Sequence, residues 1–422
     1  MEASSDPGRS GGAPTVKSPP RRAYAQLGEV FWFMMMKLSV QVHNSLETVS
    51  KEWPVSSADA PANARYHVFQ TLTFLRVWWN SFGRGGAVTP CLMEVREAEG
   101  RPVLFAPFAL SKRGLARILT FADADAADYN APILFPVDYV WTRERAAELW
   151  RLIVEALPDF DLVIASKMPE RVGGLLNPLF LIANAPNDVA CHGNDLRRPW
   201  DEIERAIPFR KTLLKRMRAL GRVGALDYFV VADEQDNDEV LAFVLRQKQR
   251  RFEETKVPGF DVDREKYAFF QEGTHSFARA RMLHLVGLKV GNEIVGAMWG
   301  LVQDKVYYAI LIGSEGSDWA KYSIGRIVYY KTLEWLHAAG FEYMDLGIGD
   351  EPWKLDHCDT TVPLAQMTVI RTWRGRWYMR RMRALESLRG TVLWRKIRPF
   401  KWVVLRRLGG AFAGHTQGRC RG

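Results

Sequence analysis

Residues 282–346 restrict the fold more than any other part of the chain. Short polar turns separate three alternating apolar runs there, at Met282–Val290, Glu293–Val302 and Lys305–Ile312. The first turn is Gly291-Asn292, a pair typical of a tight β-hairpin, so we predict a three-stranded meander. After the meander, apolar residues recur at helical spacing over 323–339 and stop at Gly340, which predicts a long amphipathic helix. A strand, Phe341–Leu346, should follow it.

The earlier half of the chain has a similar order of elements. We predict helices at Phe69–Phe82 and Arg143–Leu157, and strands at Pro90–Arg96, Val103–Leu110 and Phe160–Ala165. The hairpin turn at Gly100 lies 192 residues before the one at Asn292 (292 − 100). We expect the fold to be α/β (α+β) with mixed central sheets, and a duplicated unit is one explanation of this order.

Composition divides the 422 residues into segments. Gly, Ser, Pro and Arg dominate residues 1–22, and we expect a disordered tail over 1–26. Two domains are expected at 27–205 and 206–375, and a basic amphipathic extension with C-terminal basic helices at 376–422. Residues 371–407 contain thirteen Lys or Arg and one acid, and two more Arg follow. The segment from residue 371 to the end therefore has a charge of +14, whereas the whole chain has a net charge of +10. Residues 1–370 therefore carry −4 (10 − 14).

Cysteine use and hydropathy indicate a cellular location. The four cysteines are scattered without a CxxC pair, which predicts free thiols in a reducing compartment. The longest apolar block near the start, Val30–Met36, is far shorter than the roughly 20 residues that span a bilayer. We expect a cytoplasmic protein, and the Trp- and Arg-rich segment 377–408 suggests peripheral contact with the anionic inner face of a membrane. A helix packed on the protein, with its basic side in water, fits this segment equally well.

The start of the helix over 323–339 could bind an anion. The sequence "KYSIGRIVYY" begins the helix, and the first backbone N–H groups of a helix have no partner within it. Ser323 could cap the helix or bond a ligand, Gly325 permits close approach, and Lys321 and Arg326 add charge. A simple helix cap explains the same residues.

Acids and a lysine follow the strand at 341–346. The run "YMDLGIGDEPWKLDHCD" places Asp345 and Lys354 at its end, where they suit general-base work and the binding of an anionic substrate. A solvated loop with ordinary charges is the alternative. Neighbouring acids in the short run Asp356–Asp359 rarely converge on one ion, so we expect no metal.

Three segments resemble a known family. They are "FRKTLLKRMRALGR", "LVGLKVGNEIVGAMWGLV" and "YAILIGSEGSDWAKYSIGRIVYYKTLEWLHAAGFEYMDLGIGDEPWK". Together they resemble the acetyltransferases associated with bacterial cellulose and exopolysaccharide biosynthesis. That family belongs to the GCN-five-related N-acetyltransferase (GNAT) superfamily and is similar in build to Fem-type peptidyltransferases. The earlier run "FQTLTFLRVWWNSFG…LMEVREAEGRPVLFAPFAL" resembles the family's N-terminal half, so the likeness extends over about residues 66–375. Two differences are that "YSIG" lacks the family's Pro and that Trp353 stands where the family has Tyr.

The resemblance implies tandem acyl-CoA N-acyltransferase folds. Acetyl-CoA or another acyl-CoA would lie between two splayed strands, with its pyrophosphate at Tyr322, Ser323, Gly325 and Arg326. A substrate amine or hydroxyl, on a small-molecule or saccharide acceptor from polysaccharide or cell-envelope synthesis, would attack the thioester. Asp345 is the expected base, Tyr308 would line the acceptor cleft, and Lys354 would bind substrate.

Two alternatives stay open at this point. One is aminoacyl transfer of the Fem type from charged tRNA, for which the basic helix Phe209–Leu220 would offer a polyanion-binding face. The other is a non-catalytic scaffold at the membrane surface with a decayed site, which the missing Pro in "YSIG" motivates.

Overall fold

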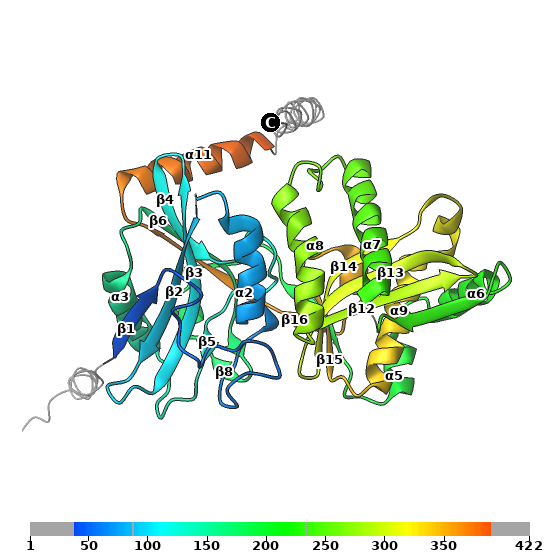
Figure 1. Cartoon of the computed structure of the whole chain (residues 1–422), viewed down its shortest axis with the longest axis horizontal. Coiled ribbons are helices and arrows are strands. Elements are labelled where there is room, and N and C mark those ends of the chain that lie inside the picture. The colour runs from blue at the N-terminus through cyan, green and yellow to red at the C-terminus, as the bar shows by residue number, and fades with distance from the viewer. Residues whose placement is uncertain (1–37, 87, 233, 390–422) are drawn as a thin grey trace, which may run out of the picture.

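The computed structural model describes residues 38–86, 88–232 and 234–389. These residues form two mixed β-sheets with helices between and around them (Figure 1). The expected α/β class and the tandem arrangement are therefore confirmed. The tail expected at 1–26 and the part of the basic extension beyond residue 389 lie outside the described residues.

The first sheet has the strand order β1-β2-β3-β4-β6-β17-β9, and β5 pairs with β3. Its strands are β1 (Ser39–His43), β2 (Val88–Arg96), β3 (Pro102–Arg113), β4 (Ala116–Phe121), β5 (Ile133–Leu134), β6 (Leu162–Pro169), β9 (Ala185–Pro186) and β17 (Leu364–Ile370). A separate small hairpin joins β7 (Arg171–Val172) to β8 (Leu175–Leu176). The helical segments of this half are η1 (Val68–Gln70), α2 (Leu72–Trp78), η2 (Trp79–Gly83), α3 (Arg143–Ala156) and α4 (Pro178–Leu181).

The second sheet has the order β11-β12-β13-β14-β15-β10-β16. Its strands are β10 (Cys191–Asp195), β11 (Leu226–Val230), β12 (Leu283–Val290), β13 (Glu293–Gln303), β14 (Val306–Ser314), β15 (Tyr343–Ile348) and β16 (Thr360–Val362). Its helical segments are α5 (Trp200–Ala206), α6 (Arg210–Leu220), α7 (Glu234–Glu254), α8 (Arg264–Arg279), η3 (Ser317–Tyr322), α9 (Ile324–Ala338) and α10 (Pro352–His357). The last described helix is α11 (Trp373–Arg389).

The two halves exchange strands. β10 comes from the first half of the chain but pairs with β15 and β16 in the second sheet. In return, β17 crosses to the first sheet and pairs with β6 and β9. A cut at 205/206, the expected domain boundary, therefore does not separate the two sheets.

A shared hydrophobic core also joins the halves. α2, α7 and α8 lie between the sheets (Figure 1), and their apolar side chains form one cluster with residues of both sheets. The rings of Phe74 on α2 and Phe269 on α8 are 5.4 Å apart, in an edge-to-face contact. α9 covers the outer face of the second sheet, and α3 covers that of the first.

Most predicted elements are present, with shifts of a few residues at their ends. The helix predicted over Phe69–Phe82 is interrupted, because Thr71 has an extended backbone and its hydroxyl accepts the Phe74 N–H, so that α2 begins there. β10 and its place in the second sheet were not predicted, since the run "CHGND" lacks the alternation of a strand.

Candidate active site

The two central strands of the second sheet separate along their length. β14 and β15 run parallel and pair only over Val306–Tyr308 and Tyr343–Asp345. Beyond Tyr308, β14 pairs with β13 alone, while β15 continues with β10. A gap therefore opens between the two strands, with Tyr308 and Asp345 at its apex. This is the splay that the resemblance implies.

A β-bulge lies on β14 just beyond the apex. The pairing with β13 shifts from Gly300–Ala309 to Trp299–Leu311, which leaves Ile310 as the extra residue. The extra residue of a bulge is not paired in the ladder, so its backbone groups are free to face another partner. On this strand such a partner would come from the gap.

The start of α9 lies at the open end of the gap. An ideal Cβ on Gly325 would be 3.6 Å from the Ser314 hydroxyl, at the end of β14, so these segments are adjacent. Ser323 is the N-cap residue in the left-handed conformation (φ 56°), and its side chain does not cap the helix. Instead its hydroxyl accepts a hydrogen bond from Arg216 on α6. The first amides of α9 are therefore not capped by Ser323.

Two guanidinium groups increase the positive potential at the start of α9. The Arg326 guanidinium lies over the Phe209 ring, 5.6 Å from its centre, and Arg216 reaches Ser323. Neither arginine has a carboxylate partner within ion-pair distance among the described residues. Ser323, Gly325 and Arg326 are half-buried, so this turn is partly exposed. A helix N-terminus beside two arginines without carboxylate partners suits a phosphate or pyrophosphate.

At the apex of the gap, Asp345 is buried, with 2% of its surface exposed. One carboxylate oxygen accepts a hydrogen bond from the Tyr129 hydroxyl at 2.7 Å, and the other accepts one from the Gly347 backbone N–H at 2.6 Å. Burial, together with the nearby charge of Asp128, raises the pKa of Asp345 to about 7, against the lowering effect of these hydrogen bonds. This carboxyl group can therefore gain and lose a proton near neutral pH.

Tyr129 belongs to the other half of the chain, and so does the partner of Tyr308. The Tyr308 hydroxyl lies 3.2 Å from Nδ1 of His67, whose ring stacks on Tyr129 with centres 4.5 Å apart. Burial lowers the pKa of His67 to about 4, so its imidazole is neutral at pH 7. Tyr307 faces the α9 side of the sheet beside His284, so Tyr308 alone reaches this cluster, which confirms that the two tyrosines occupy opposite faces.

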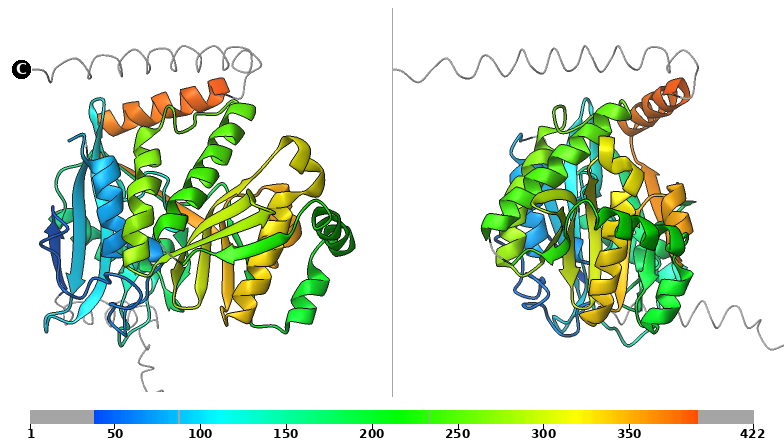
Figure 2. Two further views of the ribbon diagram at one scale, coloured as in Figure 1. Left: turned by 45° about the vertical axis from the view of Figure 1, so that its right-hand side comes forward. Right: turned by 90° about the vertical axis from the view of Figure 1, so that its right-hand side faces the viewer.

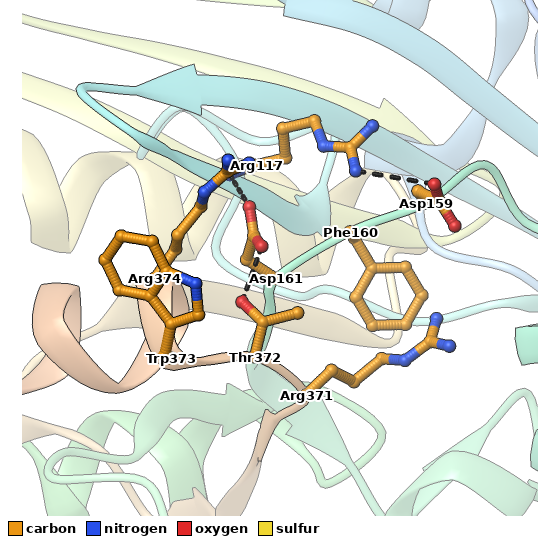
Figure 3. A pocket seen from close by; sticks show the side chains of 8 residues that line it. All are labelled: Arg117, Asp159, Phe160, Asp161, Arg371, Thr372, Trp373 and Arg374. Atoms are coloured by element: carbon orange, nitrogen blue, oxygen red, sulfur yellow. Dashed lines mark hydrogen bonds and ion pairs between the residues drawn. The ribbon is translucent and has the colours of Figure 1, made fainter.

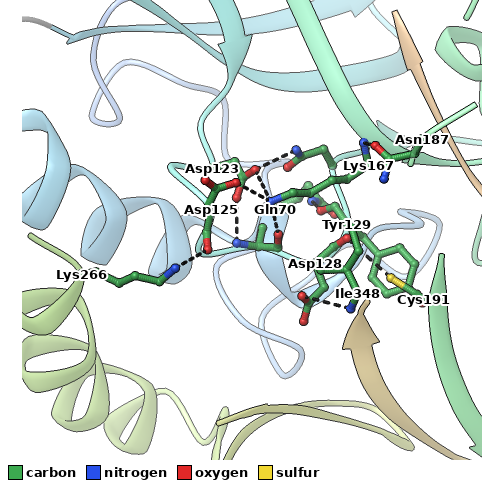
Figure 4. A network of polar contacts seen from close by, with 12 residues as sticks. Gln70, Asp123, Asp125, Asp128, Tyr129, Lys167, Asn187, Cys191, Lys266 and Ile348 are labelled. Atoms are coloured by element: carbon green, nitrogen blue, oxygen red, sulfur yellow. Dashed lines mark hydrogen bonds and ion pairs between the residues drawn. The ribbon is translucent and has the colours of Figure 1, made fainter. Parts of the chain in front are cut away.

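An acidic loop of the first half supports the cluster (Figure 4). Asp128 accepts the Ile348 N–H at 3.3 Å, and burial raises the pKa of its carboxyl group. Lys167 stabilises the loop through ion pairs with Asp123 (2.8 Å) and Asp125 (3.1 Å). The loop that presents Tyr129 is therefore held by charge pairs in its own half.

Lys354 lies close by but has local partners. Its ammonium donates to the Ile348 carbonyl at 2.8 Å and lies 3.2 Å from the Glu351 carboxylate. The side chain is buried and holds the turn that follows β15. The contact with substrate expected for Lys354 stays a prediction.

The corresponding strands of the first half have a different loop. β4 and β6 pair in parallel over two residue pairs only, and a cavity of about 330 Å³ lies beside them. The chain after β4 supplies Asp123 and Asp125 to the wall of this cavity, instead of a helix start. This cavity therefore lacks the helix N-terminus that could bind a phosphate group at the corresponding place in the second half.

Sequence reasoning placed some of these residues and missed others. The structure brings Tyr308 and Asp345 together at the apex, and it places Tyr322, Ser323, Gly325 and Arg326 at the start of α9. It adds His67, Tyr129 and Arg216. The signal for Arg216 was the basic helix in which it lies, whereas nothing local to the sequence pointed to His67 or Tyr129.

We expect Tyr129→Phe to shift the pH dependence of the reaction. The Tyr129 hydroxyl stabilises the ionised form of Asp345, so removing it raises the pKa of Asp345 above about 7. At pH 7 kcat/KM should fall about tenfold and should recover at higher pH. The measurement is a pH–rate profile. Tyr228→Phe is the control, since the Tyr228 hydroxyl bonds Thr332 away from the gap. Equal pH–rate profiles for the two variants would contradict a role of the Tyr129 hydroxyl in setting the pKa of Asp345.

Comparison with known proteins identifies the fold. Residues 208–355 match the model of the acetyltransferase (GNAT) domain family. The structure of FemX is similar, with a TM-score of 0.52 and 9% identity over 79% of this chain and 97% of that one. A conserved protein of unknown function from Bacteroides thetaiotaomicron VPI-5482 gives a TM-score of 0.48, with 10% identity over 79% of this chain and 100% of that one. No curated protein matches the sequence. Residues 208–355 thus match the GNAT domain family, and the fold of the chain is similar to that of FemX.

Proposed function

We propose that this chain, whose residues 208–355 are a GNAT domain, transfers an acyl group from acyl-CoA to an amine or hydroxyl at the junction of its two halves. The observation that carries the proposal is the gap between β14 and β15. At its open end lies the start of α9 with its two arginines, and at its apex lies a buried carboxyl group that titrates near pH 7.

The donor would lie along the gap. Its pyrophosphate would accept hydrogen bonds from the first amides of α9, with Arg216, Arg326 and the Ser323 hydroxyl beside it. The acyl thioester would reach toward the apex, beside the bulge at Ile310. A backbone N–H freed by the bulge is a suitable donor to the oxyanion that forms when the thioester carbonyl is attacked.

The chemistry would be direct transfer. The acceptor nitrogen or oxygen would attack the thioester carbonyl carbon while its proton passes to the Asp345 carboxylate, which gives a tetrahedral oxyanion. Collapse of this oxyanion would restore the carbonyl, break the carbon–sulfur bond and release the CoA thiolate. That proton is then available to the departing thiolate. Tyr129 and Tyr308 would orient the acceptor around Asp345. Among the described residues, no cluster of His, Cys, Asp or Glu is arranged to hold a metal ion.

The acceptor class comes from the sequence resemblance alone. That resemblance favours an amine or hydroxyl on a polysaccharide or cell-envelope precursor. A cytoplasmic enzyme working at the inner face of the membrane would meet such precursors. Within the described residues no helix has both the length and the apolar character needed to cross a bilayer.

The test is release of free thiol from a panel of acyl-CoAs, with cell-envelope sugars as acceptors. We expect turnover with at least one donor and acceptor pair, and donor binding that changes little between 50 and 200 mM salt. Transfer from aminoacyl-tRNA instead, with binding that falls steeply over this salt range, would replace the proposal by the Fem-type alternative. Failure of every acyl-CoA to bind in calorimetry would favour the scaffold.

A further inference from the structure

One face of α11 carries exposed aromatic and basic side chains. Trp373 is 66% exposed and Trp377 is 47% exposed. The two tryptophans are one helical turn apart and lie on the same side of α11. Gly375 lies on the opposite side, where it is buried against the start of β6. Exposed arginines surround the two indoles, at positions 374, 376, 380 and 381. Two large exposed indoles among four cations form an unusual surface patch.

The opposite side of α11 explains why this face points outward. Tyr378 and Met379 pack on a small cluster formed by Ala116, Ile118 and Leu162 of β4 and β6. An added Cβ on Gly375 would collide with the Asp161 carbonyl, so the first turn is seated directly on the sheet. The helix lies across one end of the first half (Figure 2), and its orientation is therefore fixed by packing.

A cationic cavity of about 360 Å³ adjoins this face (Figure 3). Three guanidinium groups, from Arg117, Arg371 and Arg374, line it together with Trp373 and Phe160. The Arg371 guanidinium lies 4.6 Å from the centre of the Phe160 ring, and that of Arg374 lies 5.6 Å from the Trp373 ring. Neither has a carboxylate at ion-pair distance among the described residues.

The two acids of the cavity leave its charge positive. The Asp161 carboxylate accepts the Thr372 hydroxyl at 2.5 Å and the Arg117 N–H at 2.8 Å, so it is used within the protein. Asp159 lies 3.6 Å from Arg117 and is 85% exposed, so it is a weak partner. The three arginines and two aspartates give the lining of the cavity a net charge of +1, which suits one anionic group.

A neighbouring hairpin extends the surface. Lys112, Arg113 and Leu115 are exposed at the turn between β3 and β4, and Leu115 is 62% exposed. Arg113 and Tyr378 of α11 both line the separate cavity of about 330 Å³ beside β4 and β6, so the turn lies beside the helix. The surface thus combines apolar side chains with cations on two elements.

We propose that this face docks on an anionic phospholipid bilayer, with the indoles at the headgroup level and one lipid phosphate in the arginine cavity. Indoles favour the membrane interface, and each nearby cation strengthens binding to acidic lipids. Charge disfavours coverage by the chain that follows, because residues 390–422 contain eight Lys or Arg and no acid. The proposal is independent of acyl transfer.

The test is sedimentation of the full chain with vesicles of phosphatidylcholine alone or with 30% phosphatidylglycerol. We expect binding to the acidic vesicles only. Trp373→Ala with Trp377→Ala should weaken it at least about tenfold, and Arg374→Gln about fivefold. Val140→Ala with Arg143→Ala, which alters exposed residues near α3, is the control and should bind as the wild type. Residues 390–422 are identical in all variants, so the comparison isolates α11, and thermal unfolding verifies the fold.

Other outcomes would overturn the proposal. Equal binding to neutral vesicles would remove the role of the arginines, and unchanged binding of the double Trp variant would remove that of α11. Binding of inorganic phosphate at 10 mM without any vesicle binding would show a site for a free anion instead. Binding of tRNA in place of vesicles, weakened by the same substitutions, would identify a nucleic-acid surface.

Discussion

Replacing Asp345 by Asn is expected to lower kcat by about 10²- to 10⁴-fold, which is the usual contribution of a general base. The carboxyl group lies at the apex of the gap, and burial raises its pKa to about 7, so its ionised form is available at neutral pH. Asn has nearly the same shape, and its side-chain oxygen can still accept a hydrogen bond from the Tyr129 hydroxyl. The Asn amide cannot, however, take up a proton from the acceptor substrate. The measurement is thiol release at saturating donor and acceptor.

Asp350→Asn provides the matched control. Asp350 lies five residues further along the same segment, is exposed, and accepts hydrogen bonds from His192 and the Ala190 N–H. It should keep turnover within about threefold of the wild type. Full turnover of the Asp345→Asn variant would make Asp345 a structural group that joins the two halves.

The pH dependence of stability gives a second readout for Asp345. Its folded pKa of about 7 lies above the ordinary 3.8, so the folded protein holds a proton that the unfolded chain releases between these values. This contribution is fully present below pH 4 and is lost as the pH rises through about 7. The Asn variant carries no such proton, so its unfolding free energy should fall less over this range than that of the wild type.

Gly325→Glu is expected to weaken acyl-CoA binding by at least about 100-fold. A carboxylate in the first turn of α9 would occupy the position of the pyrophosphate and repel it. The helix itself should not suffer, because an acid near a helix N-terminus favours its dipole. The free space beside Gly325 supports this expectation, since an ideal Cβ meets only the Ser314 side chain, at 3.6 Å or more.

Gly325→Ala separates charge from bulk. The backbone of Gly325 does not have a positive φ, so Ala should fit without strain and change donor affinity by less than about fivefold. Calorimetric titration with CoA measures both variants. Equal loss of affinity in Ala and Glu would indicate a steric effect, and no loss in Glu would move the pyrophosphate away from α9.

Much of the second half could be predicted because its signals are local. The Gly291-Asn292 turn, the alternation on either side of it and the stop at Gly340 fixed three strands and a helix within a few residues. The roles of Asp345 and Tyr308 in one site came from the family resemblance, and the parallel pairing of β14 with β15 is what brings the two residues side by side. Ser323 was expected either to cap α9 or to bond a ligand, and its left-handed backbone removes the first role.

The long-range features could not be predicted from such patterns. β10 and β17 pair in the sheet of the opposite half, and pairing partners hundreds of residues apart leave no periodic signal in one sequence. The contacts of Tyr129 with Asp345 and of His67 with Tyr308 depend on that exchange and on the shared core. The site is therefore composite for a reason that only the tertiary fold reveals.

The structure of the complex with CoA tests the central claim most directly. We expect the pyrophosphate to lie within hydrogen-bond distance of the Ile324 and Gly325 amides, and the thiol to point along β14 toward Asp345. A pyrophosphate bound beside β4 and β6 of the first half, or a thiol remote from Asp345, would contradict it.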